Sequence, residues 1–342
     1  MNKTVKIVYL TAIIASILAL LYVIFLFFVP NFSLKSQGKQ YLFIRDNQTY
    51  ASVTAQLQEK TNVFSMFTFN QAASILGYKT DIKPGRYRIK SGANNFTLLR
   101  ALRSGHQTPV ELKLNNIRTK EQLAQRLSKE LMPDSMQFIT LLNDTAFLAK
   151  YHLNPYNSIA VFLPNTYNIY WNTDVEKVFE KMHKEYDKFW TDTRKQQAAA
   201  IPLSETEVII LASIVDGESN SAAEKPIIAG LYINRLQKSM LLQADPTVIF
   251  AAGDFSIKRV TSAYTSIQSP YNTYKNKGLP PGPIRIPELK TIEAVLNYDK
   301  NDYIYMCAKE TLNGEHNFAA TWAEHQINAK RYQEALNERG IR

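Results

Sequence analysis

The chain has 342 residues, a formal net charge of +10 and one cysteine. Its length predicts about two domains with ample material for a core. Lone Cys307 excludes an intramolecular disulfide, and five scattered histidines show no ligand spacing, so we expect no metal and no cofactor. Lysines and arginines form no long basic tract, so no nucleic-acid-binding module is expected, and anionic lipid or an acidic polymer outside the membrane stays compatible with the charge.

The N-terminal region contains an uncharged apolar run, Ile7 to Val29, that as a helix is long enough to cross about 30 Å of hydrocarbon. A cleaved signal peptide is the alternative, but the run exceeds the usual length of about 7 to 15 residues and no Ala-x-Ala site follows Pro30. We predict a cytoplasmic tail at 1–6 and a transmembrane signal anchor at 7–29. The protein is then a single-pass protein of the inner (plasma) membrane whose bulk is periplasmic.

The next region, residues 30–107, is predicted to be a small mixed α/β module. Alternating and helical apolar patterns predict strands at 41–44 and 86–89 and helices at 52–59, 67–76 and 97–102. This layout, with the turn Lys83-Pro84-Gly85, resembles a LysM-like module, a class that binds N-acetylglucosamine polymers. A spacer that sets the distance from the membrane is the alternative, because a shared layout does not carry binding with it.

Residues 108–342 are predicted to form a larger α+β domain, which makes the whole chain an α+β protein. Its expected elements are a strand at 110–114, helices at 119–131, 135–143 and 174–190, an exposed connection at 191–202, a hairpin of 303–308 with 315–318, and a closing helix at 321–339. His316, in this hairpin, is interpreted as structural, with a catalytic base as the alternative.

The central stretch Val208–Val248 carries the candidate chemistry. At about 100° per residue, Glu218 projects within about 20° of Leu211 and about 40° of Ile214, so it shares an apolar stripe. A carboxyl held there is poorly solvated, which raises its pKa and lets it carry a proton near neutral pH. The alternative is a solvated glutamate at a helix end, because Gly217 precedes it.

Polar groups follow this helix. Ser221 and Glu224 have the capping-box spacing for the start of a second helix. The segment 241–248 is expected to be extended, which would turn alternate side chains to one side. Tyrosines and an asparagine in the 269–274 loop are typical of sugar recognition, because rings stack on pyranose faces and amides bond hydroxyls.

Five segments, in this order, resemble the motifs of the membrane-anchored endolytic murein transglycosylases, the YceG-like family: 212–219, 233–236, 242–249, 271–274 and 278–284. The family pattern Ala-Ser-Ile-(Ile/Val)-Glu-Lys-Glu-Thr places its catalytic glutamate at Glu218. Asp216, Gly217 and Ser219 stand where the family has glutamate, lysine and threonine. Residues 161–167 resemble a further family block, which is either a wall of the glycan groove or a turn that packs aromatic side chains.

The resemblance implies a lyase that cleaves peptidoglycan within nascent strands. Glu218 donates a proton to the oxygen between N-acetylmuramic acid and N-acetylglucosamine, and the muramic acid C6 hydroxyl attacks C1 to leave a 1,6-anhydro end. It also implies work in cell-wall assembly beside peptidoglycan synthases, the penicillin-binding proteins, where such cutting can terminate strand elongation. The residues expected to bind the glycan are Asn234, Arg235, Gln243, Asp245, Thr247, Tyr271, Asn272 and Tyr274.

Two other functions stay open at this point. An ordinary glycoside hydrolase uses a second carboxylate, so a muramidase with Glu218 and Asp245 is the first alternative. A membrane-anchored glycan-binding scaffold, in which Glu218 is structural, is the second.

Overall fold

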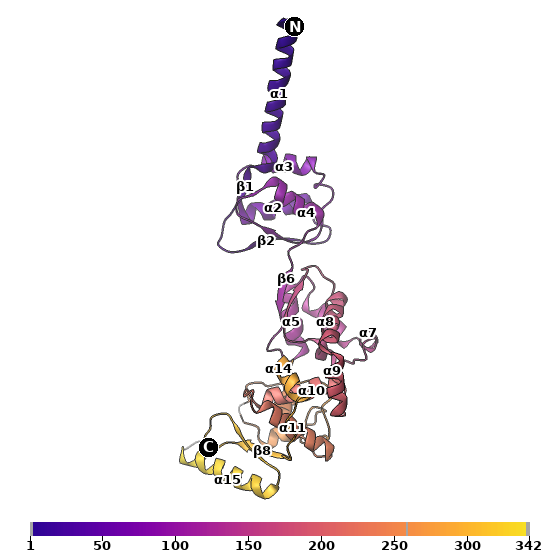
Figure 1. Ribbon diagram of the computed structural model, residues 1–342, viewed down its shortest axis with the longest axis vertical. Helices are drawn as coiled ribbons and strands as arrows, with labels where there is room; N and C mark the ends of the chain where they lie inside the picture. The colour runs from indigo at the N-terminus through magenta and orange to yellow at the C-terminus, as the bar shows by residue number, and fades with distance from the viewer. Residues whose placement is uncertain (1–2, 258, 340–342) are drawn as a thin grey trace. The chain divides into compact units, whose positions relative to one another are not determined.

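The computed structural model describes residues 3–257 and 259–339. Its chain divides into two compact units, and Figure 1 shows the order of the elements along it. The first unit runs to Glu111 and takes in 130–132 and 168–173; the second comprises 112–129, 133–167 and the chain from Asp174 onward. Helices dominate, and the strands of the described residues form sheets of two or three strands. The predicted α+β class is confirmed.

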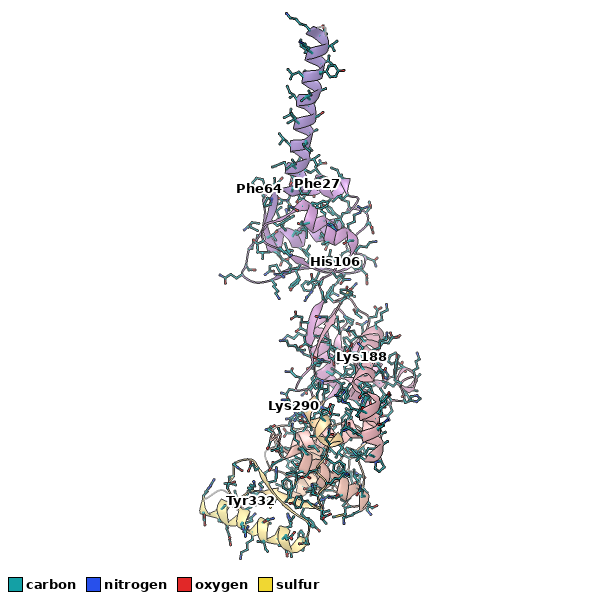
Figure 2. The ribbon with its side chains drawn as sticks, in the orientation of Figure 1. Phe27, Phe64, His106, Lys188, Lys290 and Tyr332 are labelled. Atoms are coloured by element: carbon teal, nitrogen blue, oxygen red, sulfur yellow. The ribbon has the colours of Figure 1, made fainter. Side chains whose placement is uncertain are left out.

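Beyond Lys6, helix α1 (Lys3–Phe28) presents mostly apolar side chains on every side, and of its residues only Leu26 is buried. It is the one helix among the described residues that is by itself long and apolar enough to cross a membrane. Figure 2 shows its side chains standing free of the rest of the chain except near Phe27. Such an exposed all-apolar surface is typical of a helix that lies in lipid, because water would make its exposure costly.

The rest of the first unit is a small α/β module. Strand β1 (Pro30–Leu34) lies between β3 (Thr61–Val63) and β5 (Ala93–Asn94), and β2 (Gln40–Ile44) pairs antiparallel with β4 (Gly85–Ile89). Helices α2 (Tyr50–Lys60), α3 (Met66–Ile75) and α4 (Asn95–Ser104) begin after Thr49, Ser65 and Asn94, whose side chains each cap a helix N-terminus.

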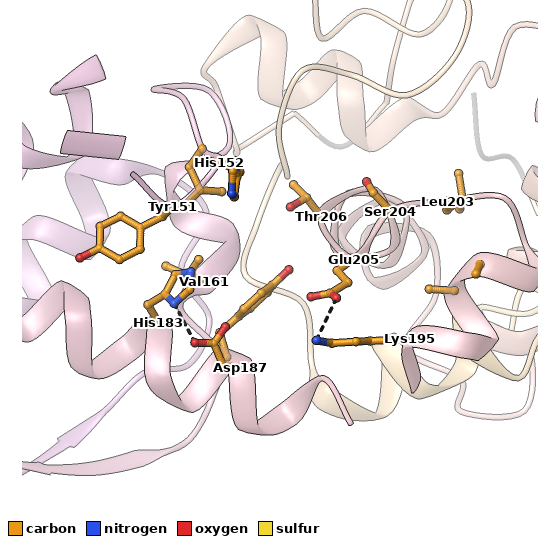
Figure 3. A pocket seen from close by; sticks show the side chains of 14 residues that line it. Tyr151, His152, Val161, His183, Asp187, Lys195, Leu203, Ser204, Glu205 and Thr206 are labelled. Carbon is orange, nitrogen blue, oxygen red and sulfur yellow. Dashed lines mark hydrogen bonds and ion pairs between the residues drawn. The ribbon is translucent and has the colours of Figure 1, made fainter. Parts of the chain in front are cut away.

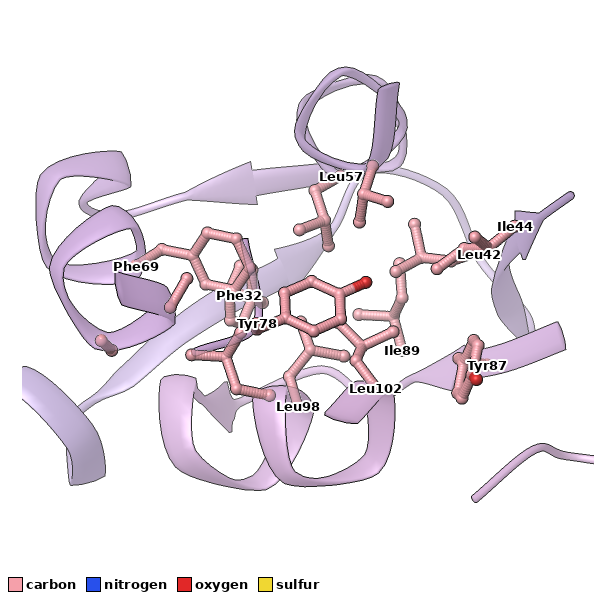
Figure 4. Close-up of a cluster of buried hydrophobic side chains, with 14 of the residues drawn as sticks. Phe32, Leu42, Ile44, Leu57, Phe69, Tyr78, Tyr87, Ile89, Leu98 and Leu102 are labelled. Carbon is pink, nitrogen blue, oxygen red and sulfur yellow. The ribbon is translucent and has the colours of Figure 1, made fainter. Parts of the chain in front are cut away.

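The core of this module is aromatic and aliphatic. Phe32, Leu42, Leu57 and Phe69 meet there with Tyr78 (Figure 4), and all five are essentially inaccessible to solvent. The two predicted strands and three predicted helices are present; β1, β3 and β5 were not predicted. The resemblance to a LysM-like module stays a prediction.

The following elements are mostly helical: β6 (Val110–Lys113), α5 (Lys120–Glu130), α6 (Ser135–Asn143), α7 (Thr145–Ala149), the 3₁₀ helix η1 (Ser158–Val161), β7 (Thr166–Ile169), α8 (Val175–Phe189) and α9 (Asp192–Ala200). Strands β6 and β7 form a two-stranded sheet. The segment 191–202, expected as an exposed connection, is indeed mostly exposed, but it contains the helix α9, which Thr191 caps and which buries Ala198. Glutamines and alanines in this segment favour a helix.

Helix α10 (Glu205–Glu218) is the centre of the second unit. A capping box between Ser204 and Glu207 starts it, and every residue from Val208 to Asp216 is buried. Helices α11 (Lys225–Gln237), α12 (Asp245–Ala252) and α14 (Leu289–Leu296) pack against it. A helix buried on all sides places its last residues where the surrounding elements converge.

The C-terminal elements are α13 (Ser262–Thr265), β8 (Tyr305–Ala308), β9 (His316–Ala319) and α15 (Trp322–Glu338). The predicted hairpin is confirmed, with Cys307 opposite Asn317. Two expectations are wrong. The segment 241–248 is not an extended strand, because Gln243 has a positive φ and Asp245-Pro246 begins α12, where proline suits a first helical turn. The capping box of Ser221 and Glu224 does not form, since Glu224 makes no cap hydrogen bond.

Candidate active site

Glu218 is the last residue of α10 and lies in a pocket of about 420 Å³. The neighbouring residue Ser219 is extended, so the chain leaves the helix here and opens one side of the carboxyl group. The pocket walls come from α10, α11, the segment before α12 and its first residue, the loop 269–274, the hairpin β8–β9 and α15. Segments distant in sequence therefore surround one acid.

The environment of Glu218 favours its protonated form. Burial among protein atoms raises the pKa of Glu218 to about 7, although the side chain keeps partial exposure to the pocket. A hydrogen bond from Tyr232 and the charge of Arg235 act in the opposite direction, and the charge of Asp245 adds to the rise. Near neutral pH the carboxyl is therefore close to half protonated, which suits a group that both donates and accepts a proton.

Tyr232 holds this carboxyl in place. It lies on α11, is 1% exposed, and its hydroxyl donates to Glu218 Oε1 at 2.5 Å. Burial, reinforced by the adjacent carboxylate, raises the pKa of Tyr232 well above its ordinary value, so the phenol stays a donor. Within the described residues Oε2 of Glu218 makes no hydrogen bond, which leaves it free for a ligand.

Arg235 supplies a buried positive charge to the same pocket. Its Nε donates to the carbonyl of Ile304 at 2.6 Å, and Nη1 donates to the carbonyl of Leu242 at 2.8 Å and, more weakly, to Gln243 Oε1 at 3.3 Å. The guanidinium therefore ties the start of the hairpin to the segment before α12. Arg235 thus lies at the pocket, and its predicted contact with a glycan stays a prediction.

Three further predicted residues line the pocket. Gln243 is exposed and has a left-handed backbone, with φ of 51°. Asp245 is exposed at the start of α12, and the hydroxyl of Tyr274 donates to its Oδ1 at 2.6 Å. Gly217 permits this arrangement: a Cβ there would lie 2.8 Å from Cβ of Pro246, so a larger residue would push α12 and Asp245 away.

Thr247 and Asn272, by contrast, are fully buried and do not reach the pocket. The hydroxyl of Thr247 donates to the carbonyl of Ala244 at 2.7 Å and lies 2.8 Å from the hydroxyl of Thr273. The amide of Asn272 donates to the carbonyls of Thr265 and Ile267. The expected contact of these two residues with a glycan is therefore corrected. Both side chains are buried, and their polar atoms form hydrogen bonds within the loops around the site.

Asn234 and Tyr271 also lie outside the pocket. Asn234 Nδ2 donates to the carbonyls of Asn301 at 2.7 Å and Tyr303 at 2.9 Å, so it holds the approach to β8. Tyr271 packs its ring on Phe250 and donates to a carbonyl of the 154–157 turn. Both side chains support the loops around the site, and their predicted role as glycan ligands stays a prediction.

Aromatic residues of the C-terminal elements were missed. Tyr305 stacks on His325 with ring centroids 5.2 Å apart, and Trp322 lies against Tyr305 at 5.5 Å. These rings line the pocket of Glu218, and the Trp322 side chain is exposed. Exposed rings beside a polar pocket suit the apolar face of a sugar. Their pattern in the sequence is that of an ordinary hairpin and helix, so only the packing of α15 on β8 brings them to the site.

Asp216 faces away from the pocket, as its angle of about 200° from Glu218 predicts. Its carboxylate accepts from Lys225 Nζ at 2.7 Å and Thr291 Oγ1 at 2.6 Å, and Arg285 Nε lies 3.2 Å from Oδ2. All four side chains are largely buried, so the charges of Lys225 and Arg285 compensate that of Asp216 away from water. This cluster joins α10, α11 and α14 behind the catalytic candidate.

A second pocket, of about 490 Å³, borders the start of α10, at the other end of the helix from Glu218 (Figure 3). His183 and Asp187 of α8 form an ion pair in its wall, with Nδ1 3.0 Å from Oδ2. Lys195 and Glu205 form another at 3.7 Å. None of the predicted site residues lines this pocket.

The fold and the site define an α+β protein whose central helix ends in an acid that lies in a pocket. A crystallographic structure of a yceG-like protein from Listeria monocytogenes has this fold, with a TM-score of 0.55, 26% sequence identity, and coverage of 85% of this chain and 99% of that one. The sequence pattern of the YceG-like family matches residues 42–331. The chain therefore belongs to the YceG-like family, which confirms the resemblance seen in its motifs.

Two curated relatives are named endolytic murein transglycosylase. The protein of Bacillus subtilis (strain 168) is 38% identical over 168 residues, which are 49% of this chain and 46% of that protein. The protein of Streptococcus pneumoniae (strain ATCC BAA-255 / R6) is 29% identical over 325 residues, covering 81% of this chain and 57% of that protein. The chain thus spans about half the length of the curated relatives it matches.

Proposed function

We propose that this protein is an endolytic lytic transglycosylase of peptidoglycan. The observation that carries the proposal is the environment of the Glu218 carboxyl in its pocket. Tyr232 orients this carboxyl through a hydrogen bond of 2.5 Å, and burial raises its pKa to about 7. A group of this kind donates a proton to a leaving oxygen at neutral pH. The family and the names of its curated relatives support the same activity.

The reaction follows from the single acid. Protonated Glu218 donates to the oxygen between N-acetylmuramic acid and N-acetylglucosamine, and the bond from that oxygen to C1 of the muramic acid breaks. The C6 hydroxyl of the same muramic acid attacks C1 and loses its proton to a base, for which the new Glu218 carboxylate is one candidate. A 1,6-anhydro ring forms without water. The rings of Tyr305 and Trp322 are placed to support a sugar during these steps.

Asp245 favours a second candidate function, because it lines the same pocket. In a muramidase it would act on water or on C1 while Glu218 serves as the acid. The hydrogen bond from Tyr274 already engages Oδ1 of Asp245, which suits a group that orients a ligand as well as one that reacts. The two functions differ in their products, since hydrolysis leaves reducing ends.

The cellular setting is part of the proposal. Helix α1 anchors the chain in the inner (plasma) membrane as a single pass, with a cytoplasmic N-terminus and the bulk in the periplasm. From there the enzyme cuts nascent strands beside the peptidoglycan synthases, the penicillin-binding proteins, and ends their elongation. The apolar surface of α1 supports the anchoring.

The deciding experiment digests purified, uncrosslinked peptidoglycan strands with the detergent-solubilised chain and identifies the new ends by mass spectrometry. We expect 1,6-anhydro-N-acetylmuramic acid at internal cuts. Reducing ends, together with a loss in Asp245→Asn as deep as in Glu218→Gln, would establish the muramidase instead. If the folded wild-type chain cleaves no glycan, the result would favour the function of a glycan-binding scaffold.

A further inference from the structure

Glu224 and His316 form a buried pair beside the pocket of Glu218. The Glu224 carboxylate accepts three hydrogen bonds: from the Ser219 hydroxyl at 2.9 Å, from the backbone N–H of His316 at 2.6 Å and from His316 Nδ1 at 3.1 Å. Burial by itself would raise the pKa of Glu224, but these hydrogen bonds outweigh it and hold the pKa below its ordinary value. Glu224 is therefore a fixed negative charge behind the imidazole.

This arrangement sets the state of the imidazole. A carboxylate that accepts from Nδ1 favours the neutral tautomer with hydrogen on Nδ1, and leaves Nε2 as an acceptor. The His316 side chain is 16% exposed and lines the pocket that holds Glu218. Within the described part of the chain Nε2 makes no hydrogen bond. Nε2 is thus the ring nitrogen that stays free to accept a proton.

Anchoring of the hairpin does not by itself explain why the His316 ring also bonds to Glu224. The backbone N–H of His316 already fastens the start of β9 to Glu224 at 2.6 Å, and Ala308 pairs with His316 across the hairpin. The bond from Nδ1 adds a defined ring orientation to that anchor. The same relationship, a carboxylate that orients an imidazole whose second nitrogen stays free, is the one used by general bases in other enzymes.

We propose that His316 is the base of the reaction in this pocket, an inference that rests on the proposed glycan cleavage. Nε2 accepts the proton of the attacking hydroxyl as its oxygen forms the bond to C1. The bond from C1 to the leaving oxygen breaks at the same centre, and that oxygen takes the proton of Glu218. The step ends with an imidazolium stabilised by Glu224 and with a Glu218 carboxylate, and proton exchange with water restores both.

The test replaces His316 by asparagine. The asparagine amide keeps a donor near the position of Nδ1, so the bond to Glu224 and the fold are retained, but no atom replaces Nε2. We expect kcat to fall by about 10² to 10⁴-fold, the range of general acid–base catalysis, with KM changed little and the thermal unfolding temperature unchanged. A purely structural histidine would leave kcat intact in this variant.

His183 provides the matched control. It also presents Nδ1 to a carboxylate, Asp187 at 3.0 Å, and its side chain is 22% exposed, but it lies in the other pocket (Figure 3). The substitution His183→Asn should therefore leave kcat and KM at the wild-type values. A loss common to both variants would be an effect of stability and would overturn the assignment of His316.

A second variant decides the matter if His316→Asn does not fold. In Glu224→Gln the amide group donates to Nδ1, which moves the ring proton to Nε2 and removes the base while the ring stays. We expect a similar loss of kcat, and a folded Glu224→Gln chain with full kcat overturns the proposal. Absence of cleavage by the wild type defeats the proposed function itself, whereas an active wild type with an equally active His316→Asn defeats only this inference.

Discussion

The hydroxyl of Tyr232 on α11 donates a 2.5 Å hydrogen bond to Oε1 of Glu218 at the end of α10. Fourteen positions separate the two residues in the sequence. Two effects on the pKa of Glu218 oppose each other here. Burial raises the pKa of Glu218, and this bond lowers it. Tyr232 therefore moderates the acid that it also orients.

The first prediction concerns Tyr232→Phe. Loss of the hydrogen bond removes a stabiliser of the carboxylate, so the pKa of Glu218 should rise above its value of about 7. The limb of the pH–kcat profile that reports the acid should move to higher pH, and kcat should fall because Oε1 is no longer held. Profiles measured between pH 5 and about 9 check this. A limb at the wild-type pH would show that Tyr232 has no influence on the ionisation.

The second prediction concerns Glu218→Gln and activity. The amide keeps the volume and accepts the bond from Tyr232, but it carries no acidic proton. Cleavage should drop by at least about 10² to 10⁴-fold. The assay is the release of cut strands at pH 7, with binding of uncut glycan as the control for the pocket. Cleavage at the wild-type rate would exclude Glu218 as the proton donor.

The third prediction concerns the same variant and stability. Between the ordinary pKa of 4.5 and the folded value of about 7, the folded chain keeps a proton on Glu218 that the unfolded chain has released. Unfolding therefore releases a proton, and the free energy of unfolding falls as pH rises through this window, by up to about 1.4 kcal/mol per pH unit.

Glu218→Gln lacks this loss, so its free energy of unfolding relative to wild type should increase from pH 4.5 to pH 7 and then level off. Urea denaturation at several pH values measures the difference. A difference that stays constant with pH would mean that the folded and unfolded states bind this proton equally.

The fourth prediction concerns the buried cluster of Asp216. Lys225→Met removes the ammonium 2.7 Å from Asp216 Oδ1 and leaves the carboxylate with less compensation, so it should cost about 3 to 5 kcal/mol. The control is Lys177→Met, which removes a partner 3.0 Å from Asp174 where both side chains are mostly exposed. That change should have little measurable effect on the free energy of unfolding, because solvent screens an exposed pair. Equal thermal shifts in the two variants would contradict a special contribution of the buried cluster.

The fifth prediction concerns topology. Because α1 is the described helix that by itself can span a membrane, protease added to spheroplasts should digest the second unit and spare a short N-terminal fragment. Antibodies against the two units follow the digestion. A mature chain free in the soluble fraction and beginning near residue 30 would contradict a retained anchor.

Local patterns account for much of the fold. The apolar run before Pro30, the alternation in β2 and β4, and the periodicity of α8 and α10 each depend on neighbouring residues, so they can be read without knowledge of distant contacts. The errors occur where local signals compete. Asp245-Pro246 begins a helix inside a segment that alternates like a strand. The Glu224 side chain, expected in a capping box, instead pairs with His316.

For the site, the sequence alone was enough to propose Glu218 as the candidate acid, because its angle to Leu211 and Ile214 and its family motif are properties of one short segment. It also selected Arg235, Gln243, Asp245 and Tyr274 among the residues of the pocket. Only the tertiary structure showed that Asn234, Thr247, Tyr271 and Asn272 bond to the surrounding loops, and that Tyr232, Tyr305, Trp322 and His316 line the pocket of the acid. The physical reason is that burial and hydrogen-bond partners are set by contacts between segments as far apart as α10 and α15, which no local spacing encodes.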